Sequence, residues 1–185
     1  MFIKLEPEFL KSFLLGAVKR IDIWSPWITE YGMSILQEVA SARSDLEINV
    51  HCRLVDDDII IGMLDVSGLH SLLRSGRNIH LFVHDDLHAK LFLVDRCKAI
   101  VGSYNLTQKA FKQNYELAFI TDQCQEIFET TNHWIFREVF AGQVWAKCLF
   151  LEDFKKKFPD QQAFMNNEMD TSKLKNVLYG LSLRR

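Results

Sequence analysis

His88-Ala-Lys90-Leu-Phe-Leu-Val-Asp95, followed after six residues by Gly102-Ser103-Tyr-Asn105, is the stretch that decides how this 185-residue chain folds. Its apolar middle is typical of a central strand that is buried on both faces of a sheet. Residues 96–98 indicate a polar turn, and residues 99–101 begin a returning strand. Gly102 permits the backbone to come close to a ligand. The stretch therefore predicts a β-hairpin with polar groups gathered at its open end.

Strand geometry indicates which of these polar side chains act together. Residues two apart on a strand point to the same side, and residues an odd number apart point to opposite sides. His88 and Lys90 therefore share a side, whereas Asp95 points away or ends the strand, where we expect it to anchor the turn. Ser103 and Asn105 are again two apart, beyond the returning strand. We expect the hairpin to bring this second pair beside the first pair.

The spacing H-x-K, four residues, D, six residues, G-S-x-N resembles the signature of the phospholipase D superfamily. It is most similar to the small bacterial nuclease branch, which carries one copy of the motif per chain. The stretch Asn114-Tyr-Glu116-Leu-Ala-Phe-Ile120 resembles the family's next strand, and residues 20–27 and 46–53 resemble its first two strands. The resemblance implies an α/β fold with a mixed β-sheet flanked by helices on both faces, an α-β-α sandwich. We expect this catalytic domain to cover residues 1–150.

The apolar patterns along the chain also alternate between helix-like and strand-like, which favours a mixed sheet covered by helices. We expect helices over residues 6–20, 29–44, 56–74 and 125–147. Thr29 is expected to cap the second of these helices. We expect strands over residues 21–24, 46–54 and 79–83, two more in the hairpin, and another after Tyr115. Residues 151–185 carry 7 basic and 5 acidic side chains. We expect them to form a C-terminal basic tail whose last stretch, from Lys173 to Leu183, is helix-like.

The residue types suit cleavage of a phosphodiester. Its anionic oxygens must be neutralised before a nucleophile can approach, and Lys90 supplies a point charge while Ser103 and Asn105 supply directed hydrogen bonds. An imidazole that is neutral near pH 7 has a free lone pair with which to attack phosphorus, so His88 is the candidate nucleophile. The resemblance implies that Glu116 supports this histidine. Asp95 and Gly102 are expected to be structural members of the motif.

The 185 residues contain one copy of the motif, because none of the other five histidines is followed by the same spacing. In the resembled family a second histidine, from a second motif copy, protonates the leaving group. A chain with one copy would have to form a true twofold dimer. We therefore expect a homodimer with one shared active site, to which each chain contributes His88, Lys90, Ser103, Asn105 and Glu116.

We expect no metal and no cofactor. His84-Asp-Asp-Leu-His88 is rich in metal ligands, but it leads into an apolar strand and not into the helix that the H-E-x-x-H zinc motif requires. The four cysteines form no C-x-x-C pair, which favours free thiols in a reducing compartment. No apolar run approaches the roughly 20 residues of a membrane span, and the first residues do not resemble a signal peptide. These features predict a cytoplasmic protein without membrane association.

The charge balance gives limited support to nucleic-acid binding. The formal net charge is −2, whereas a DNA-contacting face is usually basic. Lys109, Lys112 and Arg53 supply local positive charge near the expected site, and a partner protein could supply target recognition. Trp24 and Trp27 flank the turn after the first long strand, where they could stack on bases or pack in the core or a dimer interface.

Three functions are consistent with these patterns. The first is a metal-independent phosphodiesterase, a nuclease that cleaves nucleic acid, DNA rather than RNA, through a covalent phosphohistidine, as in restriction or phage defence. The second is a phospholipid hydrolase or phosphatidyl transferase with the same site, although no amphipathic membrane helix is evident in the sequence. The third is a catalytically retired scaffold that keeps the fold for binding. The intact set of polar residues favours the first.

Overall fold

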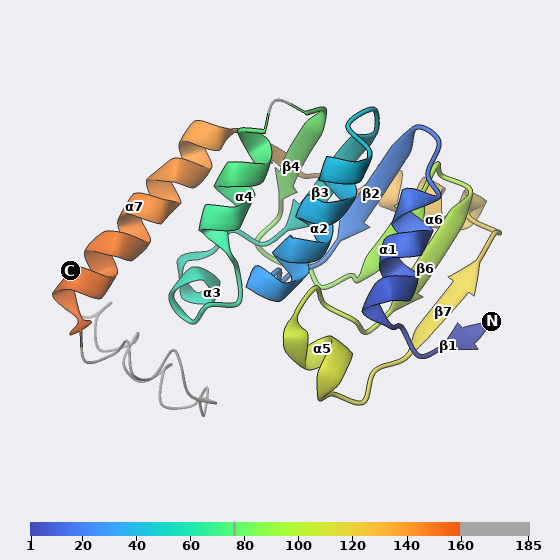
Figure 1. Cartoon of the computed structure of the whole chain (residues 1–185), viewed down its shortest axis with the longest axis horizontal. Helices are drawn as coiled ribbons and strands as arrows, with labels where there is room; N and C mark the ends of the chain where they lie inside the picture. Colours follow the sequence, from blue (N-terminus) through green and yellow to red (C-terminus); the bar gives the residue numbers. More distant parts are fainter. Residues whose placement is uncertain (76, 160–185) are drawn as a thin grey trace.

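The computed structural model describes residues 1–75 and 77–159, which form one eight-stranded sheet and seven helices (Figure 1). The strands are β1 (Phe2–Ile3), β2 (Arg20–Trp24), β3 (Glu47–Cys52), β4 (Ile79–Val83), β5 (Leu91–Val94), β6 (Lys98–Gly102), β7 (Ala118–Thr121) and β8 (Arg137–Val139). The helices are α1 (Pro7–Leu15), α2 (Glu30–Ala42), α3 (Asp56–Ile60), α4 (Val66–Leu73), α5 (Gln108–Lys112), α6 (Gln125–Asn132) and α7 (Ala141–Lys157).

The strand order is β1-β7-β6-β5-β2-β3-β4-β8, and the sheet is mixed. Strands β2, β3 and β4 run parallel, whereas β5 pairs antiparallel with β2, and β6 and β7 continue the antiparallel half. The carboxyl ends of β2 and β3 therefore lie at the same edge as the start of β5 and the end of β6. The expected hairpin is confirmed, with Leu91 opposite Val101 at its open end.

Successive side chains along each strand point to opposite faces of the sheet, so the buried apolar residues form two separate cores. Ile23 on β2 and Phe92 on β5 belong to the larger core, which also contains Leu10 and Leu14 of α1. Their neighbours Trp24, Leu91, Leu93, Ala99 and Cys124 form a smaller cluster on the opposite face. In Figure 1, α1, α2 and α4 lie in front of the sheet and α6 lies behind it. The expected α/β architecture, with helices on both faces, is thus confirmed.

The turn of the hairpin is held by a carboxylate. Asp95 and Arg96 both have positive φ, 51° and 58°, which non-glycine residues rarely adopt. The Asp95 carboxylate accepts hydrogen bonds from the backbone N–H groups of Val18, Lys19 and Arg20, at 2.7, 2.8 and 2.9 Å. Partial burial would raise the pKa of this carboxyl, but the three N–H donors outweigh it and the pKa lies below its usual value. Asp95 therefore joins the turn to the segment before β2.

Three sequence expectations are wrong in detail. The helix expected over residues 125–147 is interrupted, because residues 137–139 pair with β4 as the antiparallel edge strand β8. The helical region expected over residues 56–74 consists of two helices, α3 and α4, with a turn at Gly62, which has φ of 74°. Thr29 does occupy the N-cap position of α2, but its side chain makes no capping hydrogen bond. The short elements β1 and α5 were not expected.

Helix α7 runs from Ala141 to Lys157 and so continues through residue 150, where we expected the catalytic domain to end. The helix-like stretch expected from Lys173 to Leu183 lies outside the described residues. Within the described part of the chain, every helix is too short or too polar to cross a lipid bilayer.

Candidate active site

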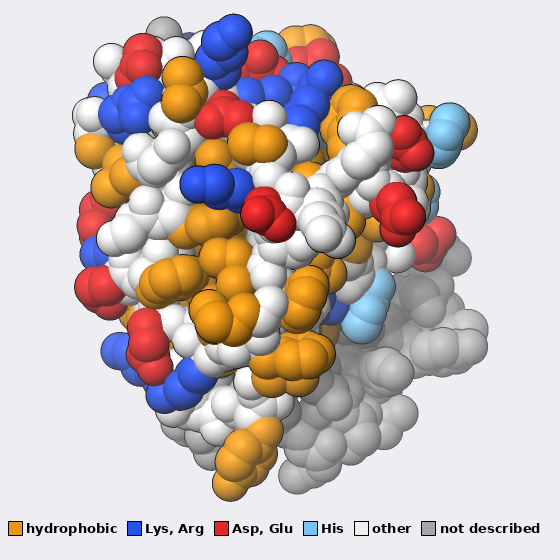
Figure 2. Space-filling model, turned by 90° about the vertical axis from the view of Figure 1, so that its right-hand side faces the viewer, with side chains coloured by type: hydrophobic (Ala, Val, Ile, Leu, Met, Phe, Trp, Pro, Cys, Tyr) orange, Lys and Arg blue, Asp and Glu red, His pale blue; other side chains and the backbone are white. Residues whose placement is uncertain are grey.

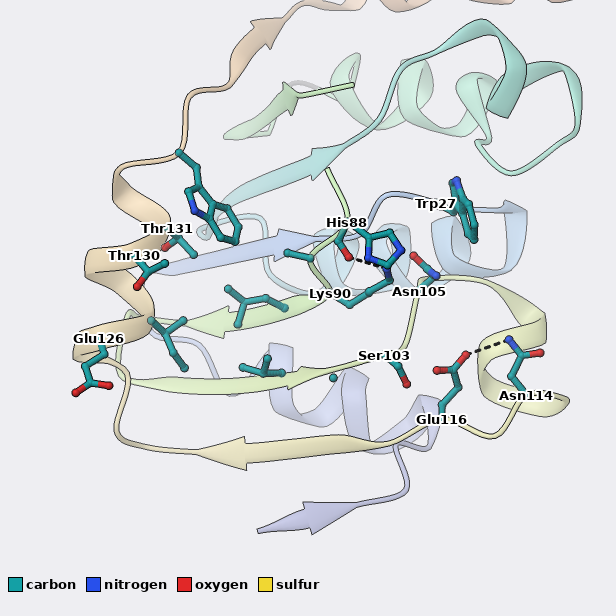
Figure 3. Close-up of a pocket in the computed structure, with 16 residues that line it drawn as sticks. Trp27, His88, Lys90, Ser103, Asn105, Asn114, Glu116, Glu126, Thr130 and Thr131 are labelled. Atoms are coloured by element: carbon teal, nitrogen blue, oxygen red, sulfur yellow. Dashed lines mark hydrogen bonds between the residues drawn. The ribbon is translucent and has the colours of Figure 1, made fainter. Parts of the chain in front are cut away.

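A cavity of about 740 Å³ opens where the start of β5 and the end of β6 lie beside the segment that leads into β7 (Figure 3). Six of the seven residues singled out from the sequence line it, and Asp95 does not. Those that line it are His88, Lys90, Gly102, Ser103, Asn105 and Glu116. The hairpin and the segment entering β7 thus bring together groups that are up to 28 residues apart in the sequence.

Lys90 lies at the base of the cavity and is only 9 % exposed. Its ammonium donates a hydrogen bond of 2.6 Å to the backbone carbonyl oxygen of His88. Burial lowers the pKa of Lys90 below its ordinary value, because desolvation disfavours the charged form, and the negative charge of Glu116 partly opposes this. The His88 side chain is exposed, so its ring is accessible from the cavity.

Ser103 is fixed by the next strand segment. Its backbone N–H donates to the carbonyl oxygen of Leu117 at 3.0 Å, and its hydroxyl accepts from the N–H of Leu117 at 3.1 Å. The hydroxyl hydrogen remains available for a ligand, because a hydroxyl both accepts and donates. Gly102 is required beside it: a Cβ at this position would overlap the Leu117 carbonyl oxygen and the Ala118 backbone.

Asn105 is buried, and its amide oxygen has no hydrogen-bond partner among the described residues. Buried polar atoms in proteins are nearly always paired, so an unpaired one that borders a cavity is a candidate ligand contact. The amide nitrogen can donate to a phosphate oxygen, whereas the unpaired amide oxygen can accept only from a donor such as a hydroxyl group. The position of Asn105 therefore fits the phosphate-binding role that its motif suggests.

Glu116 differs from the expectation in its partner. Its carboxylate accepts a hydrogen bond of 3.0 Å from the side-chain amide of Asn114, drawn as a dashed line in Figure 3. The resemblance implied that it would support the imidazole of His88 instead. In the described structure Glu116 shares the cavity with His88 and acts on Lys90 through its charge. Asn114, which the sequence did not single out, orients this carboxylate.

The opposite wall of the cavity was missed at the sequence level. It comes from α6 and the segment that follows it, and it consists of Glu126, Ile127, Thr130, Thr131 and Trp134. These residues carry no motif, and the single helix expected over residues 125–147 gave no reason to place them here. Of the two tryptophans proposed to stack on bases, Trp27 lines the cavity, whereas Trp24 is buried against His51 with ring centroids 4.3 Å apart.

The ligand-rich stretch before His88 forms an exposed turn. The backbone N–H of Asp86 donates to the ring nitrogen Nδ1 of His84 at 3.1 Å, and Asp85 is exposed. Across residues 1–75 and 77–159, no three histidine, cysteine or acidic side chains gather closely enough to hold a metal ion. All four cysteines are unpaired thiols.

Comparison with known proteins identifies the family. The family model described as "Cardiolipin synthase, PLD-like domain" matches residues 10–137. Cardiolipin synthase 1 of Staphylococcus epidermidis is 28% identical over 113 residues, which is 60% of this chain and 23% of that protein. The chain thus spans about a quarter of the length of the curated relatives it matches.

Two solved structures share the fold. Nuc, a phospholipase D family member from Salmonella typhimurium, superposes with a TM-score of 0.57 at 18% identity, over 72% of this chain and 90% of that chain. The phosphatidylserine synthase of Haemophilus influenzae gives a TM-score of 0.60 at 13% identity, over 84% of this chain and 42% of that chain. Together with the family match over residues 10–137, this shows that the chain belongs to the phospholipase D superfamily.

Proposed function

We propose that this protein is a metal-independent phosphodiesterase that cleaves nucleic acid through a phosphohistidine intermediate. One observation carries the proposal: an accessible imidazole, a buried ammonium, a hydroxyl, a carboxamide and a carboxylate line a single cavity. The similarity in fold to Nuc supports the placement among small nucleases rather than among long lipid enzymes, because this chain covers 90% of Nuc.

The chemistry divides one displacement into two steps. A ring nitrogen of His88 attacks phosphorus and forms a nitrogen–phosphorus bond while the bond to the leaving oxygen breaks. Lys90, Ser103 and Asn105 neutralise the non-bridging oxygens, so the charge that grows in the transition state meets fixed donors. The leaving alkoxide takes a proton from a second imidazole. Water then attacks phosphorus, gives its proton to that imidazole and releases His88.

The second imidazole is the reason to propose a homodimer. His88 of the partner subunit would supply it if two cavities faced each other across a twofold axis. An apolar surface borders the cavity and would be covered in such a dimer. Figure 2, which faces the β1–β7 edge, shows hydrophobic side chains gathered there. Val101 of β6, Phe119 of β7 and Phe2 of β1 are paired across these three neighbouring strands. Leu117 and Tyr115 precede Phe119 at alternate positions, and all five side chains are exposed.

A phosphatidyl transferase is the second candidate. Its support is the 28% identity to a cardiolipin synthase, whose name refers to a lipid product. The same two steps would serve it, with a lipid hydroxyl in place of water. The two functions differ in what must fit on each side of the phosphate, so turnover of separate nucleic-acid and lipid substrates distinguishes them.

The test compares substrates for one protein preparation. Labelled single-stranded DNA, duplex DNA, RNA and phosphatidylglycerol vesicles are each incubated with the full chain in EDTA, beside His88→Ala and the control His80→Ala on β4. We expect cleavage of nucleic acid by the wild-type protein and the control, and none by His88→Ala. Quenching during turnover with alkaline detergent, which preserves a phosphorus–nitrogen bond that acid would hydrolyse, should leave label on His88. Turnover of the vesicles alone would establish the lipid function instead, and turnover of none would overturn both.

A further inference from the structure

The cavity has two unlike ends. One end carries the groups that would hold and attack a phosphate, and the other carries Ile127, Thr130, Thr131 and Trp134, which the two-step chemistry does not use. In Figure 3, His88 lies between Trp27 on one side and Thr131 on the other. A ligand whose phosphate reaches His88 can therefore extend one of its substituents along the α6 wall.

Trp134 is the largest group of that wall, and its side chain is fixed from behind. It is 40 % exposed although it lines a hollow. Its backbone N–H donates to the carbonyl oxygen of Thr131 at 3.1 Å. Its ring packs against Phe136 at 6.5 Å between centroids, and Phe136 in turn meets the buried ring of His51 edge-on at 4.7 Å. The indole is therefore supported on the protein side and open on the cavity side.

The neighbours of the indole indicate what it would contact. The Thr130 hydroxyl can donate and accept hydrogen bonds, whereas the Thr131 hydroxyl already donates to the carbonyl oxygen of Phe128 at 3.2 Å and can still accept one. A flat heteroaromatic ring with donors and acceptors at its edge would use both the apolar face and these polar groups. An acyl chain would also cover the indole, but it offers these side chains neither a donor nor an acceptor.

We propose that Trp134 is a stacking platform for the nucleobase next to the scissile phosphate, with Thr130 and Thr131 at the edge of the base. This inference rests on the proposed nuclease function and specifies its substrate. Bases within a duplex are already stacked and paired, so a base reaches the indole only when it is unpaired. The substrate class is therefore single-stranded nucleic acid or unpaired segments of it.

The test uses Trp134→Ala, the conservative Trp134→Phe and the control Trp145→Ala, a tryptophan on α7 that is 46 % exposed and outside the cavity. The substrate is a single-stranded DNA oligonucleotide with one cleavable phosphodiester among methylphosphonates, prepared with normal bases and with an abasic residue on either side of that bond. Loss of one stacked base predicts that Trp134→Ala lowers kcat/KM on the normal strand by about 5- to 150-fold. Trp134→Phe should keep most of the activity, and Trp145→Ala all of it.

On the abasic strands the difference between wild-type protein and Trp134→Ala should disappear for one of the two positions, which identifies the stacked base. Wild-type protein should also prefer the single strand to its duplex. Equal losses on normal and abasic strands would show a structural effect and overturn the inference while leaving the nuclease function intact. A wild-type protein that cleaves neither strand would overturn both.

Discussion

The ammonium of Lys90 donates to the backbone carbonyl oxygen of His88 two residues earlier, at 2.6 Å. This bond lies just before the first residue of β5 and holds the ammonium beside the residue proposed to attack phosphorus. Because Lys90 is buried, its charge is poorly solvated and would be stabilised further by an anionic ligand. The hydrogen bond that fixes the backbone before β5 therefore also places a positive charge where a phosphate would bind.

Lys90→Met should separate activity from stability. Methionine keeps much of the length of the lysine side chain and removes a charge whose burial is unfavourable, so we expect the melting temperature to stay level or rise. Activity on a phosphodiester should fall at least about 100-fold, as when a transition-state donor is removed. The control is Lys98→Met at the exposed start of β6. Thermal melts and kcat measurements decide this, and an active Lys90→Met protein would contradict the assigned role.

Gly102→Ala should destabilise the fold next to the site. The added methyl group would overlap the backbone at Leu117, so β6 and the segment entering β7 would have to separate. Overpacking of this kind costs about 1–3 kcal/mol. Gly142→Ala on α7 is the control, since a Cβ there meets nothing within 4 Å. Urea unfolding of both variants measures the difference, and equal stabilities would show that the Gly102 contact relaxes freely.

Asp95→Ala should weaken the hairpin turn without a direct effect on the cavity. The change removes the acceptor for three backbone N–H groups while the turn retains its positive φ values. We expect the free energy of unfolding to fall by about 1–3 kcal/mol. Asp95→Asn should lose less, because asparagine tolerates positive φ and keeps one acceptor oxygen. If kcat of folded Asp95→Ala fell as strongly as that of His88→Ala, a purely structural role would be refuted.

His51 should make stability fall in acid. Its ring lies between Trp24 and Phe82, and neither ring nitrogen has a hydrogen-bond partner in the described part of the chain. Burial lowers its pKa to about 3. The unfolded chain, with a histidine pKa near 6.5, then binds a proton that the folded chain does not. Stability is full above pH 6.5 and falls by about 1.4 kcal/mol per pH unit as pH decreases toward 3.

The measurement is urea unfolding of wild-type protein and His51→Phe at several values between pH 4 and pH 7. Phenylalanine keeps the stacked aromatic contacts and has no proton to bind, so the variant should lose less stability over this range. Parallel curves for the two proteins would mean that His51 is not held neutral in the folded state.

Leu117→Glu tests the proposed dimer. Leu117 is 55 % exposed on the apolar surface beside the cavity, and a carboxylate there would be buried without a partner at an interface. We expect a monomer by sedimentation velocity and loss of activity at concentrations where the wild-type protein is active. Leu149→Glu on α7, where the leucine is 48 % exposed, should remain dimeric and active. An active monomer would instead require a proton donor from the same chain.

The sequence by itself determined the hairpin and the polar groups at its open end. The spacing from His88 to Asn105 is local, and strand periodicity alone sets which side chains share a side. The apolar residues of β2, β3 and β5 likewise required a buried, mixed sheet. These conclusions depend only on neighbours in the sequence, which is why they survived in the structure.

Tertiary structure alone decided the other wall of the cavity. Residues 137–139 are too few to be distinguished from a helix by periodicity, and they become β8 because β4 offers an unpaired edge. Because of this pairing, the expected long helix is interrupted, and α6 and Trp134 lie across the back of the sheet. Contacts between distant segments select these positions, and no local pattern encodes them.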